Sequence, residues 1–485
     1  MKNNIFLFFT FFFSSFFVRG QKLKEISTLE KYKNELNANL QKGYEQYKNI
    51  AFQIWNYAEV GYKEEKSSLL LQQTLKENGF AVQSGTAGMP TAFVATYGSG
   101  KPVIAILAEF DALPGLAQQA VSEKKSISGQ DAGHGCGHHL FGVASIAAGI
   151  ELKKLMDEKK ITGTIKVFGC PAEEGGGGKI YLVRAGLFND ADIAIHWHPG
   201  AENGITMTSA LANMSAKFRF NGLSAHAAGA PDRGRSALDA VEAMNYMTNM
   251  MREHVPQETR IHYVITNGGK APNVVPDFAE VYYYVRHPKR EMVKSIFDRV
   301  VKTANAAALG TETTMDYEIV GGTHDLLLNR SLAEIMQANL QKVGGVKYTD
   351  EEMVFAQKIQ SSYLFKVPNI STSDSIRPLK LDMDAGGGST DVGDVSYALP
   401  TVGLRAATWV PGTPAHSWQA VACGGTEIGT KGMMVAAKTM ALTAIDLFSN
   451  PDYIEKAKKE FILSKGNYIY EPLVGNRKPP LNYRD

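Results

Sequence analysis

The chain has 485 residues, which is more than one hydrophobic core usually holds, so we expect two domains. Hydrophobic residues make up 44% of the chain and charged residues 21%, which is typical of a soluble globular protein. The net charge is only +2 and the Lys and Arg residues are scattered, which argues against the basic stripe of a nucleic-acid-binding protein. The composition therefore predicts a globular protein without a nucleic-acid partner.

The first residues have the pattern of a secretory signal peptide. Lys2 precedes an apolar run over residues 5–18 that is rich in phenylalanine and too short to span a bilayer. We predict that residues 1–20 are removed by cleavage near Gly20–Gln21, and that the protein is exported to a periplasm or secreted. The alternative is an uncleaved membrane anchor. Either way the chain leaves the cytoplasm, and we expect no other membrane contact.

The three cysteines do not form the framework of a disulfide-rich protein. Cys136, Cys170 and Cys423 are odd in number and far apart in the sequence. The sequence alone does not decide whether Cys170 and Cys423 form a disulfide. Cys136 lies among histidines, so a metal-binding role explains it more simply than a structural one.

Helix and strand patterns alternate over the first part of the chain. Helices are predicted at residues 29–57, 64–78, 139–156 and 178–185, and strands at 102–110, 163–170 and 191–199. The strands are continuous apolar runs, which is typical of strands buried on both faces. The alternation predicts an α/β domain with a mostly parallel sheet.

The pattern changes after Ser209. Strand-like runs at residues 216–222, 260–269 and 279–286 are separated or followed by helices at 237–252 and 291–308. We interpret this region as an antiparallel sheet with two helices on one face, forming an inserted α+β domain over residues 209–322. Residues 21–208 and 323–485 then form the two parts of the larger catalytic domain.

Side chains that bind metals follow the predicted strands of the larger domain. In open α/β sheets, ligands bind at the carboxyl ends of the strands. At this edge the sequence places Glu109, Asp111, Cys136, His138, Glu173, Glu174, His196 and His198, and another strand-like run leads to His416. The set converges from distant parts of the chain, which favours a common site over isolated polar residues.

Thiolate, imidazole and carboxylate ligands together suit zinc and similar divalent ions. Because neighbours in an extended segment point to opposite sides, one member of the Glu173–Glu174 pair can hold a metal while the other acts as general base. Two alternatives remain. Cys136 could be the nucleophile of a thiol hydrolase with His138 as its base, or the protein could be a metal-dependent binder without catalysis.

Several stretches carry a family resemblance. They are "AEFDALPG", "GHGCGHHLFG", "PAEEGGGGK", "GLSAHAAGAPDRGRSALDA", "APNVVPDFAEVYYYVR", "STDVGDVSYALPT" and "PGTPAHSWQ". With them the chain resembles the amidohydrolase branch of the M20 metallopeptidases, and most nearly those members that are similar to the B subunit of p-aminobenzoyl-glutamate hydrolase. The resemblance implies hydrolysis of the amide of N-acyl, aminobenzoyl or aminoacyl amino acids by a metal-activated water. A dipeptidase-like activity of the same family is the alternative.

The resemblance also implies the roles of individual residues. Two divalent ions per subunit, Mn or Zn, would be held by Cys136 as a bridging ligand, His138, Glu174, His416 and either His198 or His196, of which we favour His198. Glu173 would be the general base. His134 and His139 would support the site without binding metal.

The insert resembles the dimerisation domain of the family, which implies a homodimer. His226 would reach into the partner's active site and stabilise the developing oxyanion. Asn273 and Arg286 would hold the carboxylate of a small-molecule substrate, an N-acyl amino acid or dipeptide, and Arg suits this role because its fork binds carboxylates bidentately. Ser389, in the glycine-rich loop over residues 386–396, would line the pocket.

Overall fold

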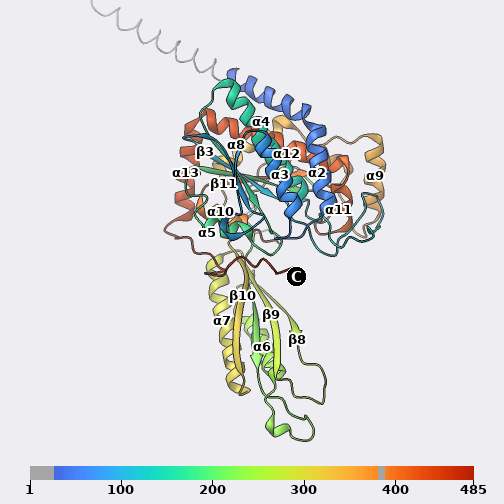
Figure 1. Ribbon diagram of the computed structural model, residues 1–485, viewed down its shortest axis with the longest axis vertical. Helices are drawn as coiled ribbons and strands as arrows, with labels where there is room; N and C mark the ends of the chain where they lie inside the picture. Colours follow the sequence, from blue (N-terminus) through green and yellow to red (C-terminus); the bar gives the residue numbers. More distant parts are fainter. Residues whose placement is uncertain (1–26, 381–387, 485) are drawn as a thin grey trace, which may run out of the picture.

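The computed structural model describes residues 27–380 and 388–484. The predicted signal peptide lies outside these residues, as do the first two residues of the loop over 386–396. Figure 1 shows a broad α/β domain from which a narrower, elongated domain projects. The expected combination of an α/β domain and a separate α+β domain is therefore confirmed.

The broad domain is built on a seven-stranded sheet with the order β1-β2-β4-β3-β5-β11-β6. Its strands are β1 (Ala81–Ser84), β2 (Phe93–Ser99), β3 (Val103–Glu109), β4 (Gly163–Cys170), β5 (Ile193–Gly200), β6 (Gly204–Ile205) and β11 (Thr401–Ala407). The four central strands β4, β3, β5 and β11 are parallel, while β1, β2 and β6 pair antiparallel at the two edges. The apolar runs predicted the parallel strands, but not the antiparallel strands β1, β2 and β6.

Helices cover both faces of this sheet. A helix over residues 27–42 is followed by α2 (Tyr44–Tyr57), α3 (Glu65–Glu77), α4 (His138–Lys159), α5 (Gly178–Arg184), α8 (Arg330–Val343), α9 (Asp350–Ser361), α10 (Val392–Ala398), α11 (Trp418–Gly424), α12 (Glu427–Ser449) and α13 (Pro451–Lys465). One face packs against α2, α3, α4, α8 and α12, and the other against α5 and α10. The single helix predicted over residues 29–57 is interrupted by a turn at Gly43.

The central helix α12 is long and apolar enough to cross a membrane, but 89% of its apolar stretch is buried inside the domain. Its contacts with α4, α8 and β11 explain that composition. A helix that is hydrophobic on all sides is expected in the core of a large domain.

The projecting domain contains an antiparallel sheet with the order β10-β7-β9-β8. Its strands are β7 (Ala212–Asn221), β8 (Arg260–Asn267), β9 (Phe278–His287) and β10 (Thr314–Thr323), and α6 (Ala237–Met251) and α7 (Arg290–Gly310) pack on one face. The two helices on one face agree with the sequence pattern. The fourth strand, β10, was missed because most of its side chains are exposed or half-buried and give little apolar alternation.

The strand register shows which end of this domain lies near the larger one. The chain enters through β7 and leaves through β10, and Asn213 pairs with Thr323 at that end. Asn221 pairs with Thr314 at the opposite end. Because β7 has ten residues at about 3.3 Å each, the two ends are about 30 Å apart. The loops over residues 222–236 and 268–277 therefore lie at the far end, away from the larger domain (Figure 1).

All three cysteines are free and buried, so Cys170 and Cys423 do not form a disulfide. Cys170 packs in the core beneath α5, whereas Cys423 packs in a separate cluster with Trp409 and Ala356. The fold keeps the two thiols in different cores.

Candidate metal centre and active site

The glycine-padded segment over residues 131–142 shapes the start of α4. Gly137 has a φ of +76°, in the left-handed region that glycine adopts without strain. A Cβ atom on Gly133 would lie 2.2 Å from the backbone carbonyl oxygen of Leu116. The glycines therefore allow a tight turn that presents Cys136 and His138 at the edge of the sheet.

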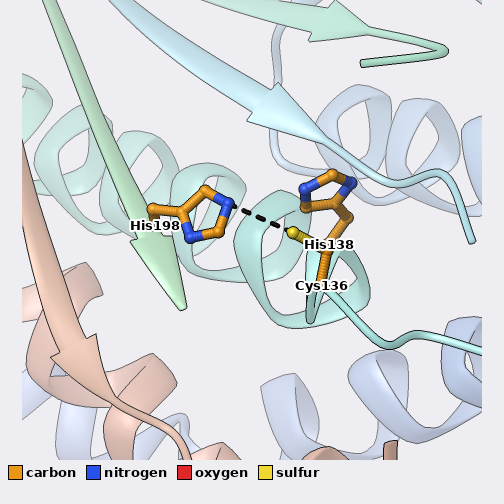
Figure 2. A group of neighbouring side chains, drawn as sticks. All are labelled: Cys136, His138 and His198. Carbon is orange, nitrogen blue, oxygen red and sulfur yellow. Dashed lines mark hydrogen bonds between the residues drawn. The ribbon is translucent and has the colours of Figure 1, made fainter. Parts of the chain in front are cut away.

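Cys136, His138 and His198 form one compact group of potential metal ligands (Figure 2). Cys136 Sγ lies 3.4 Å from His198 Nε2, and all three potential ligand atoms lie within 4.8 Å of one another. His138 is the first residue of α4, Cys136 lies in the turn just before that helix, and His198 lies near the end of β5.

The second ring nitrogen of each histidine is held by an oxygen atom. His138 Nδ1 lies 2.8 Å from Asp111 Oδ1, and His198 Nδ1 lies 2.7 Å from the carbonyl oxygen of Pro199. In both rings Nδ1–H donates to that oxygen, so Nε2 is the ring nitrogen that remains available to bind a metal. Metal-binding histidines commonly have this arrangement, and it fixes both the tautomer and the ring orientation.

Cys136 also belongs to a second group, with Glu174 and His416. His416 Nε2 lies 3.0 Å from Glu174 Oε1, and this contact raises the pKa of His416. The backbone of His416 has a φ of +58°, which is uncommon for a residue other than glycine, and its N–H donates to the carbonyl oxygen of Gly135. The loop before α11 is thus fastened to the segment that carries Cys136.

A third group joins Glu109, His138 and Glu173. Burial and then the negative charges of Glu109 and Glu174 raise the pKa of Glu173 well above its ordinary value. Burial alone would lower the pKa of His138, but interactions with the neighbouring Cys136, Asp111 and Glu109 raise it well above the ordinary value. The centre is thus a buried, electronegative environment that favours a bound cation.

Beneath this group lies an ion triad buried in the protein. Lys179 Nζ lies 2.6 Å from Glu109 Oε1 and 2.7 Å from Asp391 Oδ1, and Asp391 also accepts from the backbone N–H of Lys179. All three residues are at most 1% exposed. The triad holds Glu109 with its second oxygen 3.1 Å from His138 Nε2.

Three buried atoms at the centre have no well-oriented hydrogen-bond partner among the described residues: His138 Nε2, Glu109 Oε2 and Glu174 Oε1. They make ion-pair contacts instead: His138 Nε2 lies 3.1 Å from Glu109 Oε2, and Glu174 Oε1 lies 3.0 Å from His416 Nε2. Each of them is a potential metal ligand. The soft thiol, imidazoles and carboxylates therefore fit divalent ions such as zinc or manganese.

The remaining histidines near the centre lie apart from these groups. His196 precedes His198 on the same face of β5, but it is in none of the three groups found among the described residues; its ring packs over Gly403 of β11. His134 and His139 are buried with their rings 4.7 Å apart, and each has Nε2 at a backbone carbonyl oxygen, that of Ile54 and that of Gly424 respectively. Burial lowers the pKa of His134 to about 4, so it is neutral.

The predicted residues of the insert fall at its two opposite ends. His226 and Asn273 are exposed at the far end, where the backbone N–H of Ala227 donates to the carbonyl oxygen of Asn273. Arg286 lies near the other end of β9, paired with Asn213. No single chain therefore brings His226 or Asn273 to its own metal-ligand groups.

Arg286 and Ser389 lie where the two domains meet. The backbone N–H of Leu211, just before β7, donates to the carbonyl oxygen of Gly388. Arg286 Nε and Ser389 Oγ are both buried without a hydrogen-bond partner among the described residues. Both side chains therefore keep donors available at the junction.

The sequence placed Asp111 in the convergent set but gave it no role of its own, and it predicted no role for Lys179 or Asp391. Asp111 was visible at the end of its strand, next to the other carboxylates, and its spacing from Glu109 was the available signal. Lys179 and Asp391 are 212 positions apart, so only the fold shows that they meet.

Comparison with known proteins agrees with this architecture. A sequence model described as a peptidase dimerisation domain matches residues 211–312. The chain is 41% identical over 441 residues to the B subunit of p-aminobenzoyl-glutamate hydrolase from Escherichia coli, a match that covers 86% of this chain and 92% of that protein. It is 29% identical to the Xaa-Arg dipeptidase of Mus musculus, covering 84% of this chain and 87% of the relative.

Among solved structures, a dinuclear metal binding peptidase of the M20 family from Bacillus subtilis is similar in fold. The TM-score is 0.57 at 14% identity, and the match covers 84% of this chain and 99% of that one. Together with the relative at 41% identity, these findings show that the chain belongs to the M20 family and is a hydrolase that acts on amide bonds.

Proposed function

We propose that the protein is a metal-dependent amidohydrolase that cleaves the amide of N-acyl, aminobenzoyl or aminoacyl amino acids. The observation that carries this proposal is the convergence of three ligand groups that share Cys136 or His138. Adjacent groups that share a ligand can hold two neighbouring metal ions.

Cys136, His138, Glu174, His198 and His416 would hold the two divalent ions, with Cys136 bridging them. When bound, such ions polarise a carbonyl group and lower the pKa of a water molecule. The similar structure from Bacillus subtilis is described as a dinuclear metal binding peptidase, which supports two metal ions per subunit. The donor set suits both zinc and manganese.

Glu173 is the proposed general base. It lies beside His138 and Glu109, and burial raises its pKa, which is the direction expected of a carboxyl that takes a proton from water and returns it to the leaving amine. Glu174, its neighbour, contacts His416 instead. The two carboxylates thus point into different groups, which supports one base and one ligand.

The alternative of a cysteine nucleophile has less support. Reactive cysteines have a lowered pKa and partial exposure. Cys136 is only 7% exposed, and burial raises the pKa of its thiol. A buried thiol with a raised pKa is a weak nucleophile, whereas a metal ion would stabilise its thiolate form.

The relatives and the position of Arg286 support the proposed substrate class. One relative is named for the hydrolysis of p-aminobenzoyl-glutamate and another as an Xaa-Arg dipeptidase, and both names describe an amide whose amine side is an amino acid. Arg286 and Ser389 have unpartnered donors at the domain junction, where they would bind the carboxylate of that amino acid. p-Aminobenzoyl-glutamate is the first compound to test, and dipeptides form the alternative class.

A homodimer is proposed to complete the site. Val264 and Ile265 are 56% and 40% exposed on the edge strand β8, and Tyr246 and Met250 are exposed on α6. An uncovered apolar edge strand is a typical association surface. His226 and Asn273, at the far end of the insert, would then reach the partner's centre, where His226 would stabilise the oxyanion. Mass determination in solution should give twice 52.9 kDa, less any removed signal peptide.

Paired substitutions test the assignment of the two glutamates. Glu173→Gln should keep the metal and lose about 10²–10⁴-fold in kcat, because it removes a base but no ligand. Glu174→Gln should lose metal. Elemental analysis and hydrolysis of p-aminobenzoyl-glutamate, several N-acyl amino acids and Xaa-Arg dipeptides measure both effects. Loss of metal from Glu173→Gln with retention in Glu174→Gln would reverse the roles.

Export remains a proposal that rests on residues 1–20 alone. Expression of the full chain in a bacterial host, followed by fractionation and N-terminal sequencing, tests it. A mature protein that starts near Gln21 outside the cytoplasm is expected, whereas an intact N-terminus in the membrane fraction would indicate an anchor.

A further inference from the structure

The segment that follows α13 crosses the junction between the domains. This segment, the strap (residues 466–484), consists of turns and extended chain. In Figure 1 it is the dark red trace that runs between the broad domain and the projecting one. Its course brings it beneath the edge of the sheet that carries the metal-ligand groups.

The strap is fastened to both domains. Arg477 Nη2 lies 3.0 Å from Glu318 Oε1 on β10, and Leu473 packs against the core of the insert. On the other side, Arg184 of α5 donates to the carbonyl oxygen of Arg477 at 2.7 Å, and Val474 is buried in the core beneath the large sheet. These contacts fix the path of the strap before it reaches the active site.

The strap ends on the loop that carries Glu173 and Glu174. Tyr483 Oη donates to the backbone carbonyl oxygen of Glu174 at 2.8 Å, and Arg484 Nη2 donates to the same oxygen at 2.6 Å. The ring of Tyr483 packs edge-on against Tyr62, with centroids 5.7 Å apart. Tyr62 in turn donates to the carbonyl oxygen of Gly176 at 2.9 Å.

This loop needs such support because its backbone is unusual. Ala172 has a φ of +55°, which is strained for a residue with a Cβ atom, and Gly175 and Gly177 have φ values of +91° and +66°. Glycines lose much conformational freedom on folding, so a loop rich in them has little stiffness of its own. External hydrogen bonds must therefore define where the two glutamates point.

We propose that Tyr483 and Arg484 are positioning residues, which hold the Glu173–Glu174 loop in the geometry required for metal binding and proton transfer. This inference rests on the proposed role of Glu174 as a metal ligand. The two donors act on the backbone of Glu174, so they orient its carboxylate toward His416 without contacting substrate. The strap thereby makes a distant part of the chain a component of the active site.

The test compares Tyr483→Phe, Arg484→Ala and the double variant with the full-length wild-type protein. Tyr483→Phe keeps the ring against Tyr62 and removes only the donor. The zinc dissociation constant, measured by competition with a chromogenic chelator, should rise about tenfold or more in the double variant, as is typical when partners that orient metal ligands are removed. With saturating zinc, kcat should fall while KM changes little. Arg484→Lys keeps a side-chain donor, so it should bind zinc more tightly than Arg484→Ala.

Tyr470→Phe is the matched control. Tyr470 lies in the same strap and its hydroxyl donates to Asp394 at 2.8 Å, away from the loop. The Tyr470→Phe variant should lower the melting temperature at least as much as Tyr483→Phe does, and it should leave the zinc affinity unchanged. If the double variant binds zinc as tightly as wild type while Glu174→Gln does not, the strap has no positioning role. If Glu174→Gln itself keeps its zinc, the proposed ligand assignment fails instead.

Discussion

A mixed-dimer experiment tests whether the active site is shared between subunits. The two perturbations are His226→Ala and Glu173→Ala, each made in a separate chain. His226 follows the far end of β7, about 30 Å along the strand from the end that adjoins the catalytic domain. Because that distance is far beyond side-chain reach, His226 can contribute to catalysis only in another subunit. Each pure variant dimer should therefore be nearly inactive, for a different reason.

The expected recovery follows from two-fold symmetry. When the two variants are mixed and exchanged at random, about half of the dimers contain one chain of each kind. Such a dimer has one intact site, built from the Glu173 of one chain and the His226 of the other. Activity should therefore return to about a quarter of the wild-type value.

The assay is hydrolysis of the best substrate from the panel, before and after subunit exchange. Exchange is verified independently with two affinity tags, so that a lack of exchange is not mistaken for a lack of complementation. If His226 served its own subunit, every site in a mixed dimer would carry one lesion. No recovery despite verified exchange would refute the shared site and the reasoning from the strand register.

Three further predictions concern the metal centre. Lys179→Met should reduce the free energy of unfolding by about 3–5 kcal/mol near neutral pH, because it leaves Glu109 and Asp391 buried without a counter-charge. Burial raises the pKa of both carboxyls, so the folded state binds more protons than the unfolded state and the deficit should grow as the pH rises above the ordinary pKa of a carboxyl group. Thermal unfolding of metal-free protein at several pH values measures the deficit, and a constant deficit would contradict the argument. Burial raises the pKa of the Cys136 thiol, so metal uptake should release a proton and zinc affinity should increase with pH; a pH-independent affinity in chelator titrations would exclude thiolate ligation. Asp111→Asn should weaken zinc binding by about 10–100-fold while leaving the fold intact by circular dichroism, and unchanged affinity would show that Asp111 does not orient His138.

The sequence by itself determined the main architecture and the neighbourhood of the site. Continuous apolar runs identified the buried parallel strands, since a strand covered on both faces must be apolar throughout. The carboxyl ends of parallel strands meet at one edge, so the strand pattern alone was enough to place Cys136, Glu173 and His198 together. The short or exposed edge strands β1, β6 and β10 were not predicted, because their pairing depends on neighbours rather than on their own pattern.

Only the tertiary structure shows that His198, and not His196, lies in the group with Cys136 and His138. Alternate residues of a strand share a face, so both histidines of "HWHP" satisfy the sequence pattern equally. In the fold, Gly403 of the adjacent strand leaves room for the His196 ring, where a Cβ atom would lie 2.2 Å from His196 Nε2. His198, beyond that point, reaches Cys136.

The tertiary structure also decided which distant residues support the centre. The Lys179–Asp391 pair and the contacts of Tyr483 and Arg484 with Glu174 join positions 212, 309 and 310 residues apart. Local patterns carry the information for helices, strands and turns, because those depend on neighbours in sequence. A salt bridge or hydrogen bond between remote segments depends on how whole elements pack, and a single sequence does not display that packing.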